Sequence, residues 1–344
     1  MSIVTTLKNK NKKTLFTTPS HNGNTCIMHK FYQWYKNDIS EVDAFEPVEA
    51  LNSAEKYAAS IYNTKSTHFL TNGSTSGVIA SVLTCCTQND KLLIWNKSHK
   101  CHKNAGILAG ANIIEYEQEY NNDWGIYEPI TAEQVEKLLK LHKPKAIIIT
   151  SPTYEGIAAD IKTISQICKE NNTKLIADEA HGALYPFSNK LPQSAIEYAD
   201  YTVQSLHKTA GGINPTALLH CNSDLSPSKA LELINTTSPS YPMLATIEAN
   251  IKYLNSQKAK DTIDRLINKI ISIKEQLNNL EFYGDDPTKI LIKKSGISGS
   301  ELSEKLYSKY NIEDERSNEK SVLLLTGIGT TEKMLNRLLK LKNL

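Results

Sequence analysis

Length, composition and charge place this chain among ordinary folded proteins. It has 344 residues, 40% of them hydrophobic and 22% charged, which suits a globular chain of about two domains and excludes disordered, collagen-like and small disulfide-rich proteins. Lys and Arg number 39 against 37 Asp and Glu, so the formal net charge of +2 indicates no nucleic-acid partner. One basic cluster, which we expect to be a solvated tail, comprises Lys8, Lys10, Lys12 and Lys13.

Apolar runs and cysteines bear on location and on metal binding. The longest strand-like apolar run, residues 146–149, falls far short of the ~20 residues that span a bilayer, and the N-terminus shows no apolar signal segment. We therefore expect no membrane partner. The cysteines form no CxxC pair and no metal-ligand spacing, which predicts reduced thiols in a cytoplasmic protein and no metal site. They are Cys26, Cys85, Cys86, Cys101, Cys168 and Cys221.

Between residues 50 and 220, short apolar runs alternate with amphipathic segments. This pattern is typical of βα units and predicts an α/β fold with a mostly parallel sheet flanked by helices. Helical spacing of apolar residues indicates helices at 78–86, 131–142 and 161–170. The expected strands are residues 92–95, 112–116, 146–150, 174–178, 201–204 and 217–220.

After residue 221 the pattern changes. A short helix at 229–234 and a turn at 238–242 precede a periodic segment that predicts one long helix over 244–277. Strands at 290–293 and 322–326, with helices at 300–310 and 331–341, indicate a smaller α+β domain. The expected divisions are an N-terminal arm at 1–48, a large cofactor-binding domain at 49–243 and a small C-terminal domain at 244–344.

Polar residues follow several of the expected strands, where ligands collect in parallel sheets. A glycine- and serine-rich turn, which includes Gly73, Ser74 and Thr75, precedes the helix at 78–86. Its free amide groups and hydroxyls suit a phosphate group, although a plain helix cap would use the same residues.

Two further residues extend this pattern. Asp178 ends an apolar strand, where its carboxylate needs a cationic or proton-sharing partner. Lys208 follows a later strand, where apolar neighbours favour a lowered pKa and a nucleophilic amine. A phosphate-binding turn, an aspartate and a lysine in this order meet the needs of pyridoxal phosphate, which requires its phosphate, its ring nitrogen and its aldehyde to be held.

These residues lie in segments that resemble the pyridoxal-phosphate-dependent Orn/Lys/Arg decarboxylases of the aspartate-aminotransferase fold (fold type I). The resemblance covers nearly the whole chain. The matching segments are TPSHNG (18–23), FLTNGST (69–75), SHKC (98–101), LAGA (108–111), TSPTYEG (150–156), DEAHGA (178–183), SLHKT (205–209), TTSPSYP (236–242) and DPTK (286–289).

The resemblance implies a role for each candidate residue. Lys208 would hold the cofactor as a Schiff base and Asp178 would pair with its ring nitrogen. His99 would stack on the ring; His102 competes for this role, but only His99 keeps the family's spacing to Gly110. The remaining implied cofactor contacts are Gly73, Ser74, Thr75 and Ser205 at the phosphate, Ala180 at the other ring face, His181 at the ring hydroxyl, and His207 as a proton-handling residue. We expect Lys208, His99, His207 and Asp178 to be catalytic.

The sequence also departs from the family pattern. Arg316 follows a family glutamate at a normally non-basic position and is either a surface arginine or a clamp for the substrate α-carboxylate. The segment AGGINP (210–215) replaces a different run beside the lysine. Larger members continue into a further C-terminal domain, whereas this sequence ends at Leu344, which indicates a short form.

The primary hypothesis is decarboxylation of lysine, ornithine or arginine by a homodimer whose active site lies at the subunit interface. The substrate cation would need a carboxylate, for which Glu41, Asp43, Glu155 and Glu315 are candidates. The alternatives are transamination or a lyase reaction with the same cofactor, and a non-catalytic relative that regulates a full-length enzyme.

Overall fold

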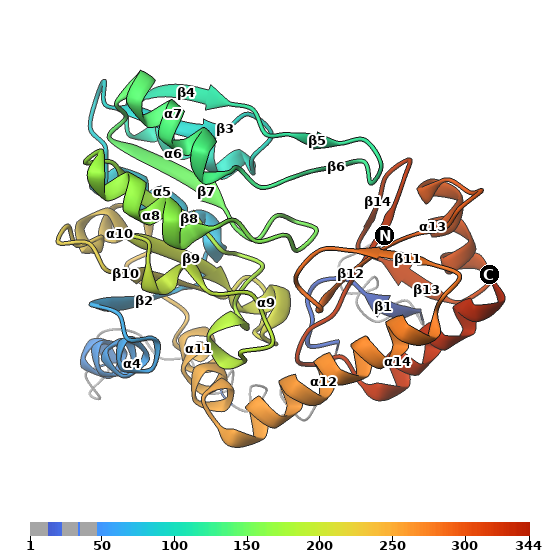
Figure 1. Ribbon diagram of the computed structural model, residues 1–344. Helices are drawn as coiled ribbons and strands as arrows, with labels where there is room; N and C mark the ends of the chain where they lie inside the picture. The colour runs from blue at the N-terminus through green and yellow to red at the C-terminus, as the bar shows by residue number, and fades with distance from the viewer. Residues whose placement is uncertain (1–12, 23–33, 35–46) are drawn as a thin grey trace, which may run out of the picture.

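The computed structural model describes residues 13–22, 34 and 47–344. It contains two main sheets, one of seven and one of four strands, that lie side by side (Figure 1). The chain is an α/β protein, as the sequence predicted. The part of the predicted N-terminal arm that is described, including Lys13, packs on the C-terminal half, where Lys13 Nζ donates to the Tyr307 carbonyl at 2.7 Å.

The larger sheet has the strand order β2-β10-β9-β8-β7-β3-β4. Its strands are parallel except β10, which runs antiparallel to both of its neighbours. The strands are β2 (Ser66–Leu70), β3 (Lys91–Trp95), β4 (Asn112–Tyr116), β7 (Ala146–Thr150), β8 (Lys174–Asp178), β9 (Tyr201–Ser205) and β10 (Ala217–Cys221). Six of them match the expected strands to within one residue at either end, whereas β2 was not predicted.

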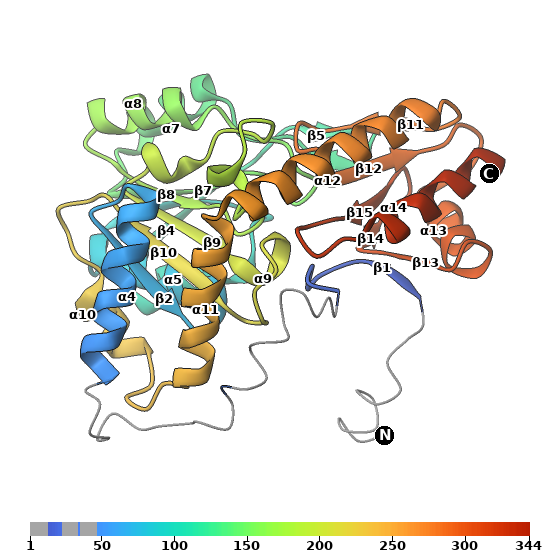
Figure 2. The same ribbon diagram turned by 90° about the horizontal axis from the view of Figure 1, so that it is seen from below.

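Helices cover both faces of this sheet because successive strand residues point to opposite sides. In β7, Ala146 and Ile148 pack under one group of helices, whereas Ile147 and Ile149 pack under the other. The first group is α5 (Gly73–Cys85), α6 (Lys100–Leu108) and α10 (Ser228–Ile234). The second face carries α7 (Ala132–His142) and α8 (Ile161–Glu170), together with α4 (Pro47–Tyr62) and α11 (Tyr241–Leu254), which lie side by side (Figure 2).

The smaller sheet is antiparallel, in the order β11-β12-β15-β14, and β13 (Ile312–Asp314) pairs in parallel with β1 (Thr14–Phe16) beside it. Its strands are β11 (Glu281–Tyr283), β12 (Lys289–Lys293), β14 (Arg316–Ser317) and β15 (Val322–Leu325). It packs with α13 (Gly299–Ser308) and α14 (Glu332–Leu338). Short elements complete the fold: the hairpin β5 (Tyr120–Asn121) and β6 (Ile126–Tyr127), α9 (Leu206–Thr209), and 3₁₀ turns at Tyr185–Phe187, Ala195–Glu197 and Leu339–Asn343.

The predicted single helix over 244–277 is wrong. The chain forms α11 and then α12 (Gln257–Gln276), and the Ser256 hydroxyl caps α12 by accepting from the Ala259 amide. A serine that caps a new helix interrupts the chain although the apolar spacing continues. Ala259, Ile263 and Ile267 of α12 pack in the core of the larger sheet, whereas Leu266, Ile270 and Ile273 pack in that of the smaller. The change between cores therefore falls within α12; the boundary at 243/244 stays a prediction.

None of the helices in residues 13–22 and 47–344 has the length and apolar character needed to cross a membrane. The five cysteines within the described ranges are free thiols, and all are buried. Cys26, Glu41, Asp43 and the remainder of the basic cluster lie outside the described residues.

Candidate active site

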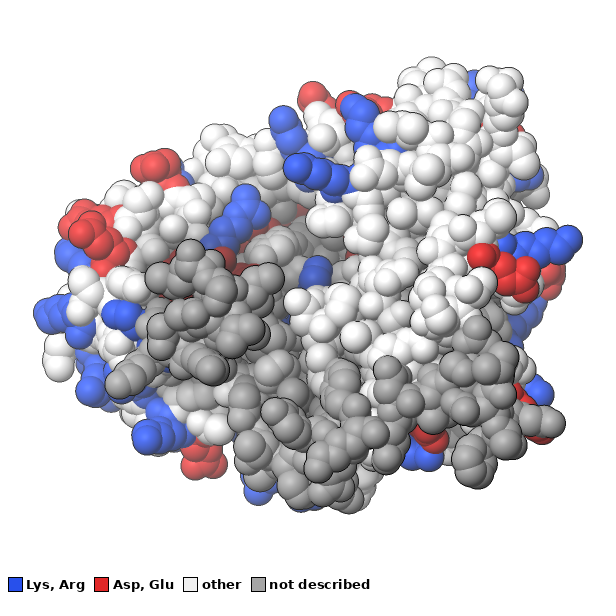
Figure 3. Space-filling view, turned by 180° about the vertical axis from the view of Figure 1, so that it is seen from behind, with Lys and Arg blue, Asp and Glu red and all other residues white. Residues whose placement is uncertain are grey.

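A cavity of about 910 Å³ lies where the strand ends of the larger sheet face the smaller one. Figure 3 shows a hollow on this side of the molecule with basic side chains around it. Nine of the ten residues predicted to contact the cofactor line the cavity: Gly73, Ser74, Thr75, His99, Asp178, Ala180, His181, His207 and Lys208. The structure thus brings residues from four separate segments of the sequence to one place.

The turn before α5 forms one end of the cavity. Gly73 begins the helix at φ +74°, a backbone conformation that side chains disfavour. Asn72, at the N-cap, makes no side-chain hydrogen bond to the first turn within the described structure, so the amide groups there stay available. With Ser74 and Thr75 also lining the cavity, this helix end suits an anionic group.

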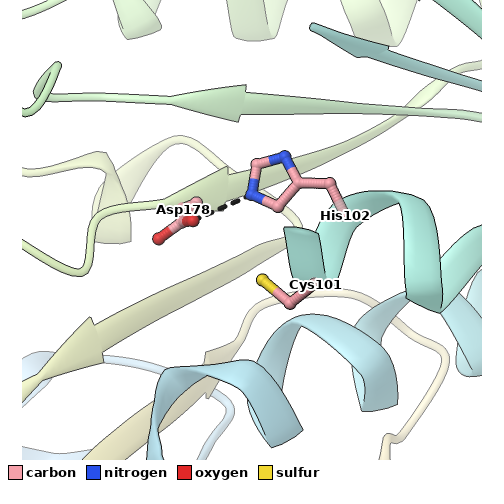
Figure 4. A group of neighbouring side chains, drawn as sticks. All are labelled: Cys101, His102 and Asp178. Atoms are coloured by element: carbon pink, nitrogen blue, oxygen red, sulfur yellow. Dashed lines mark hydrogen bonds and ion pairs between the residues drawn. The ribbon is translucent and has the colours of Figure 1, made fainter. Parts of the chain in front are cut away.

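Asp178 ends β8, and its carboxylate is held at both oxygens. The His102 imidazole, fully buried in α6, lies with Nε2 at 2.8 Å from Oδ2 (Figure 4). The Ala180 amide donates to Oδ1 at 3.2 Å. Burial alone would raise the pKa of the Asp178 carboxyl, but the hydrogen bond from His102 and the charges of His102 and Lys208 lower it. The geometry therefore favours an ionised carboxylate at the cavity wall.

His99 and His102 have different surroundings, although both come from the start of α6. His99 lines the cavity, and its Nδ1 accepts from the Cys101 amide at 3.3 Å and lies 3.0 Å from the Cys101 thiol. Burial lowers the pKa of His99, whereas the charge of Asp178 opposes that effect. His102 does not line the cavity. The side chain of His102, the other candidate for stacking on the ring, thus points to Asp178 instead of into the cavity.

Cys101, His102 and Asp178 come close enough together to hold a metal ion. Burial raises the pKa of the Cys101 thiol to about 12, so the protonated form dominates at neutral pH. The thiol lies within hydrogen-bond distance of His99, and His102 donates to Asp178, so hydrogen bonds account for the positions of these side chains.

Lys208, in α9, lies with Nζ at 3.0 Å from His181 Nε2. Burial lowers the pKa of Lys208 and the charge of Lys289 adds to this, while Asp178 opposes it. Burial and the neighbouring charges of Lys208 and Lys289 also hold the pKa of His181 well below its usual value. A neutral His181 can accept a hydrogen bond from the lysine amine at Nε2, which places its own N–H at Nδ1. That buried Nδ1 has no hydrogen-bond partner in the described structure.

A buried ion pair supports this part of the site from the smaller sheet. Lys289 and Asp286 are both fully buried and lie 2.9 Å apart. Lys289 also donates to the His181 carbonyl at 3.2 Å, and the Tyr185 hydroxyl donates to Asp286 at 3.0 Å. The pair therefore connects the smaller sheet to the residues beside Lys208. This DPTK segment (286–289) is among those that resemble the family, but its sequence alone predicts no role for it.

His207 and Ser205 have distinct positions at the end of β9. His207 lines the cavity and donates from Nδ1 to the Thr216 carbonyl at 3.1 Å, which leaves Nε2 as its basic atom when the ring is neutral. Ser205 is fully buried and is not among the residues that line the cavity. Its hydroxyl has no partner in the described ranges, so its contact with the phosphate stays a prediction.

The cavity is also lined by Glu155, which follows β7, and by Arg316, in β14. Arg316 Nη1 lies 3.6 Å from Glu155 Oε1, and its side chain is 59% exposed. Arg316 is thus a largely exposed arginine that also borders the cavity. Burial raises the pKa of Glu155, and the charge of Arg316 partly offsets this.

Glu315 is engaged elsewhere: it accepts from the Tyr154 hydroxyl at 2.6 Å and from the Thr18 amide at 2.7 Å. Four carboxylates were candidates for binding the substrate cation, and the structure describes two of them, Glu155 and Glu315. Of these two, Glu155 lines the cavity. The variant segment 210–215 also reaches the site, since Asn214 and Pro215 line the cavity. Gly212 is required locally because an added Cβ would lie 2.6 Å from Thr216 Oγ1.

The residues present fit pyridoxal phosphate. The start of α5 offers uncapped amide groups, Asp178 offers a carboxylate, and Lys208 offers an amine of lowered pKa. His181, which lines the cavity, also has a buried Nδ1 without a partner in the described structure, and a bound molecule could satisfy this polar group. These features together match the phosphate, ring and aldehyde of the cofactor.

The fold and this site define the aspartate-aminotransferase class of pyridoxal-phosphate proteins. The lysine decarboxylase LdcF of Francisella novicida superposes with a TM-score of 0.78 at 20% identity, covering 94% of this chain and 56% of that one. The ureidoglycine-glyoxylate aminotransferase of Bacillus subtilis gives a TM-score of 0.76 at 13% identity, covering 97% and 93%. These two likenesses establish the fold.

Sequence comparison identifies the family within this class. Residues 4–290 match the family described as Orn/Lys/Arg decarboxylase, major domain, and the chain belongs to this family. It is 30% identical over 319 residues to an arginine decarboxylase of Bacillus anthracis, covering 86% of this chain and 64% of the relative. The chain thus spans about two thirds of the length of the curated relative.

Proposed function

We propose that this chain decarboxylates a basic amino acid (lysine, ornithine or arginine), releasing the amine and carbon dioxide. The observation that carries the proposal is the meeting of Ser74, Thr75, Asp178, Lys208 and Glu155 around one cavity. The first four suit the cofactor, and Glu155 offers a carboxylate for a cationic substrate side chain. Family membership supports the same reaction class.

When bound, pyridoxal phosphate draws electrons away from the α-carbon of an amino acid. Ser74, Thr75 and the first amide groups of α5 would hold its phosphate. Asp178, kept ionised by its two hydrogen bonds, would keep a positive charge at the ring nitrogen, and His99 would pack against the ring. Lys208 would bind the aldehyde until the substrate amine replaces it.

The protein groups also manage charge and protons. The lowered pKa of Lys208 favours the neutral, nucleophilic amine. The α-carboxylate is lost as carbon dioxide, so a proton must take its place at the α-carbon. His207 borders the cavity with its basic Nε2, and we propose that it handles this proton. Glu155 would bind the substrate cation, which fixes the substrate in the cavity.

A second candidate is transamination, and Arg316 is the observation that favours it. Aminotransferases of this fold clamp the α-carboxylate with an arginine, which stabilises the group that a decarboxylase must lose. Arg316 borders the cavity, but the nearby Glu155 carboxylate competes for its charge. This pairing favours decarboxylation. The regulatory, non-catalytic alternative predicts no reaction at all.

Mass spectrometry of the reaction products tests the proposal. The purified chain with pyridoxal phosphate is incubated separately with lysine, ornithine and arginine, and K208A serves as the control. A product that lacks one carbon dioxide, formed by the wild type alone, would establish the reaction and its substrate. A keto acid would support transamination, and no product would support the non-catalytic alternative.

We also propose that the protein acts as a homodimer, since the family resemblance implies an active site at a subunit interface. Light scattering combined with activity measurement tests this, and a fully active monomer would contradict it. A cytoplasmic location remains a proposal, supported by the free thiols.

A further inference from the structure

His102 is a buried histidine with a single hydrogen-bond partner in the described structure. Its side chain is 0% exposed, Nε2 lies 2.8 Å from Asp178 Oδ2, and Nδ1 has no partner in residues 13–22 and 47–344. It lies on the helix turn that begins with His99, but behind the cavity wall. Figure 4 shows its ring directed from α6 at the end of β8.

The distance assigns a proton to Nε2. A nitrogen and a carboxylate oxygen at 2.8 Å cannot both be acceptors, so Nε2 carries the hydrogen and donates it to Oδ2. If the ring is neutral, Nδ1 is then an acceptor without a partner. An unsatisfied acceptor is far less costly than a buried, unpaired charge. Nδ1 therefore contributes no hydrogen bond to the stability of the fold. The hydrogen bond from Nε2 to Asp178 is the interaction that explains a histidine at this position.

The two hydrogen bonds fix the orientation of the Asp178 carboxylate. His102 reaches Oδ2 from α6, and the Ala180 amide reaches Oδ1 from the segment after β8. Each oxygen accepts one hydrogen bond and keeps further lone-pair capacity. The carboxylate is thus held from two directions while still bordering the cavity.

We propose that His102 is a positioning residue that keeps Asp178 ionised and oriented toward the ring nitrogen of the cofactor. This inference rests on the proposed function only through cofactor binding, and it does not depend on which reaction follows. His102 itself touches neither cofactor nor substrate and acts through Asp178. It therefore differs from His99, whose predicted contact with the ring is direct.

The neighbouring titratable groups come from three segments. His99 and Cys101 lie on the same helix start, Lys208 comes from α9, and His181 follows β8. When its amine is protonated, Lys208 contributes a charge that also favours ionised Asp178. Removing His102 leaves this charge in place, so we expect a weakened site rather than an abolished one.

Cofactor affinity tests the proposal without measuring catalysis. The full-length, cofactor-free protein is titrated with pyridoxal phosphate between pH 5.5 and 8.5, following tryptophan fluorescence. We expect H102L to bind about 10-fold more weakly or worse, and H102Q, whose side-chain amide can donate at a similar place, to stay within about 3-fold of the wild type. As the pH falls, the affinity of H102L should begin to decline at a higher pH than that of the wild type, because Asp178 loses its proton less readily without His102.

His220 offers the matched control. It is buried in the same sheet, its Nδ1 lies 2.9 Å from Thr67 Oγ1, and it does not line the cavity. H220L should change cofactor affinity by less than about 3-fold. Unchanged affinity in H102L, equal losses in H102L and H102Q, or an equal loss in H220L would each overturn the positioning role.

Nitrogen NMR of histidine-labelled wild type gives a second readout, which also applies if H102L does not fold. We expect the His102 signal to show a proton on Nε2 before and after cofactor addition. A proton on Nδ1 alone would overturn the inference, as would a wild type that binds no cofactor. Normal cofactor binding without amine formation would instead refute the decarboxylase proposal alone.

Discussion

Two groups of residues around the cavity differ in how firmly they are held. The sheet-end group, Asp178, His181 and Lys208, is buried or nearly so and hydrogen-bonded to regular elements of the larger sheet or to each other. The second group, Glu155 and Arg316, has a 3.6 Å ion pair in which the Arg316 side chain is 59% exposed. Fixed groups suit the cofactor, which is the same for every substrate, whereas a loose pair can exchange partners with the substrate.

The largest expected effect concerns the support of the sheet-end group. K289M removes a fully buried cation and leaves Asp286 without its ion-pair partner, which should lower the free energy of unfolding by about 3–5 kcal/mol. Urea denaturation of the cofactor-free protein measures this. The control is K293M on the same strand, whose partners Asp123 and Glu281 are exposed and whose loss should cost about 1 kcal/mol or less. Equal losses of unfolding free energy in K289M and K293M would contradict the idea that the buried ion pair contributes more than the exposed ones.

The next effect concerns Glu155, in the second group. E155Q should raise KM for the basic amino acid about 10- to 100-fold with little change in kcat, because a hydrogen bond to a charged group is lost. Norleucine, which is uncharged at the end of its side chain, provides the matched control substrate. A similar loss for both substrates would show that Glu155 does not bind the cation.

The same residue predicts a pH dependence. The pKa of Glu155 is raised above 4.5, the ordinary value of a glutamate side chain, so its carboxyl takes up a proton at a higher pH than an exposed glutamate does. Binding of a cationic side chain should therefore be strong above the raised pKa and weaken as the pH falls through it. In E155Q this component of the KM profile should be absent.

The smallest expected effect is that of R316Q. Because Arg316 is mostly exposed and opposes Glu155, its removal should change KM for a decarboxylase substrate by less than about 5-fold. Steady-state kinetics measure this change. A rise of 100-fold or more, accompanied by a keto-acid product, would instead identify Arg316 as an α-carboxylate clamp.

The sequence predicted the central strands well because their physical signal is local. Residues 146–150 and 174–178 match β7 and β8, since a strand buried on both faces is a continuous apolar run. The break before α12 was missed because a single capping serine interrupts a periodicity that otherwise continues. The predicted cofactor residues came together because the carboxyl ends of parallel strands share one edge of a sheet.

The supporting residues could not be predicted in the same way. His102 meets Asp178 across 76 positions of sequence and Lys289 meets the His181 carbonyl across 108. Such contacts depend on how α6 and β12 pack against the end of β8. One signal was present: His102 lies three residues after His99 and so falls close to the same face of the helix.

Helix α12 makes the two sheets mechanically interdependent. A helix of 20 residues is about 30 Å long, and its apolar side chains are divided between the two cores. If either core unfolded, α12 would lose part of its packing, and the other core depends on the same helix. We therefore expect the two cores to unfold cooperatively. Lys289, in the smaller sheet, donates to the backbone carbonyl of His181 beside Lys208. A change in the tilt of α12 that moved the smaller sheet would therefore also move this contact.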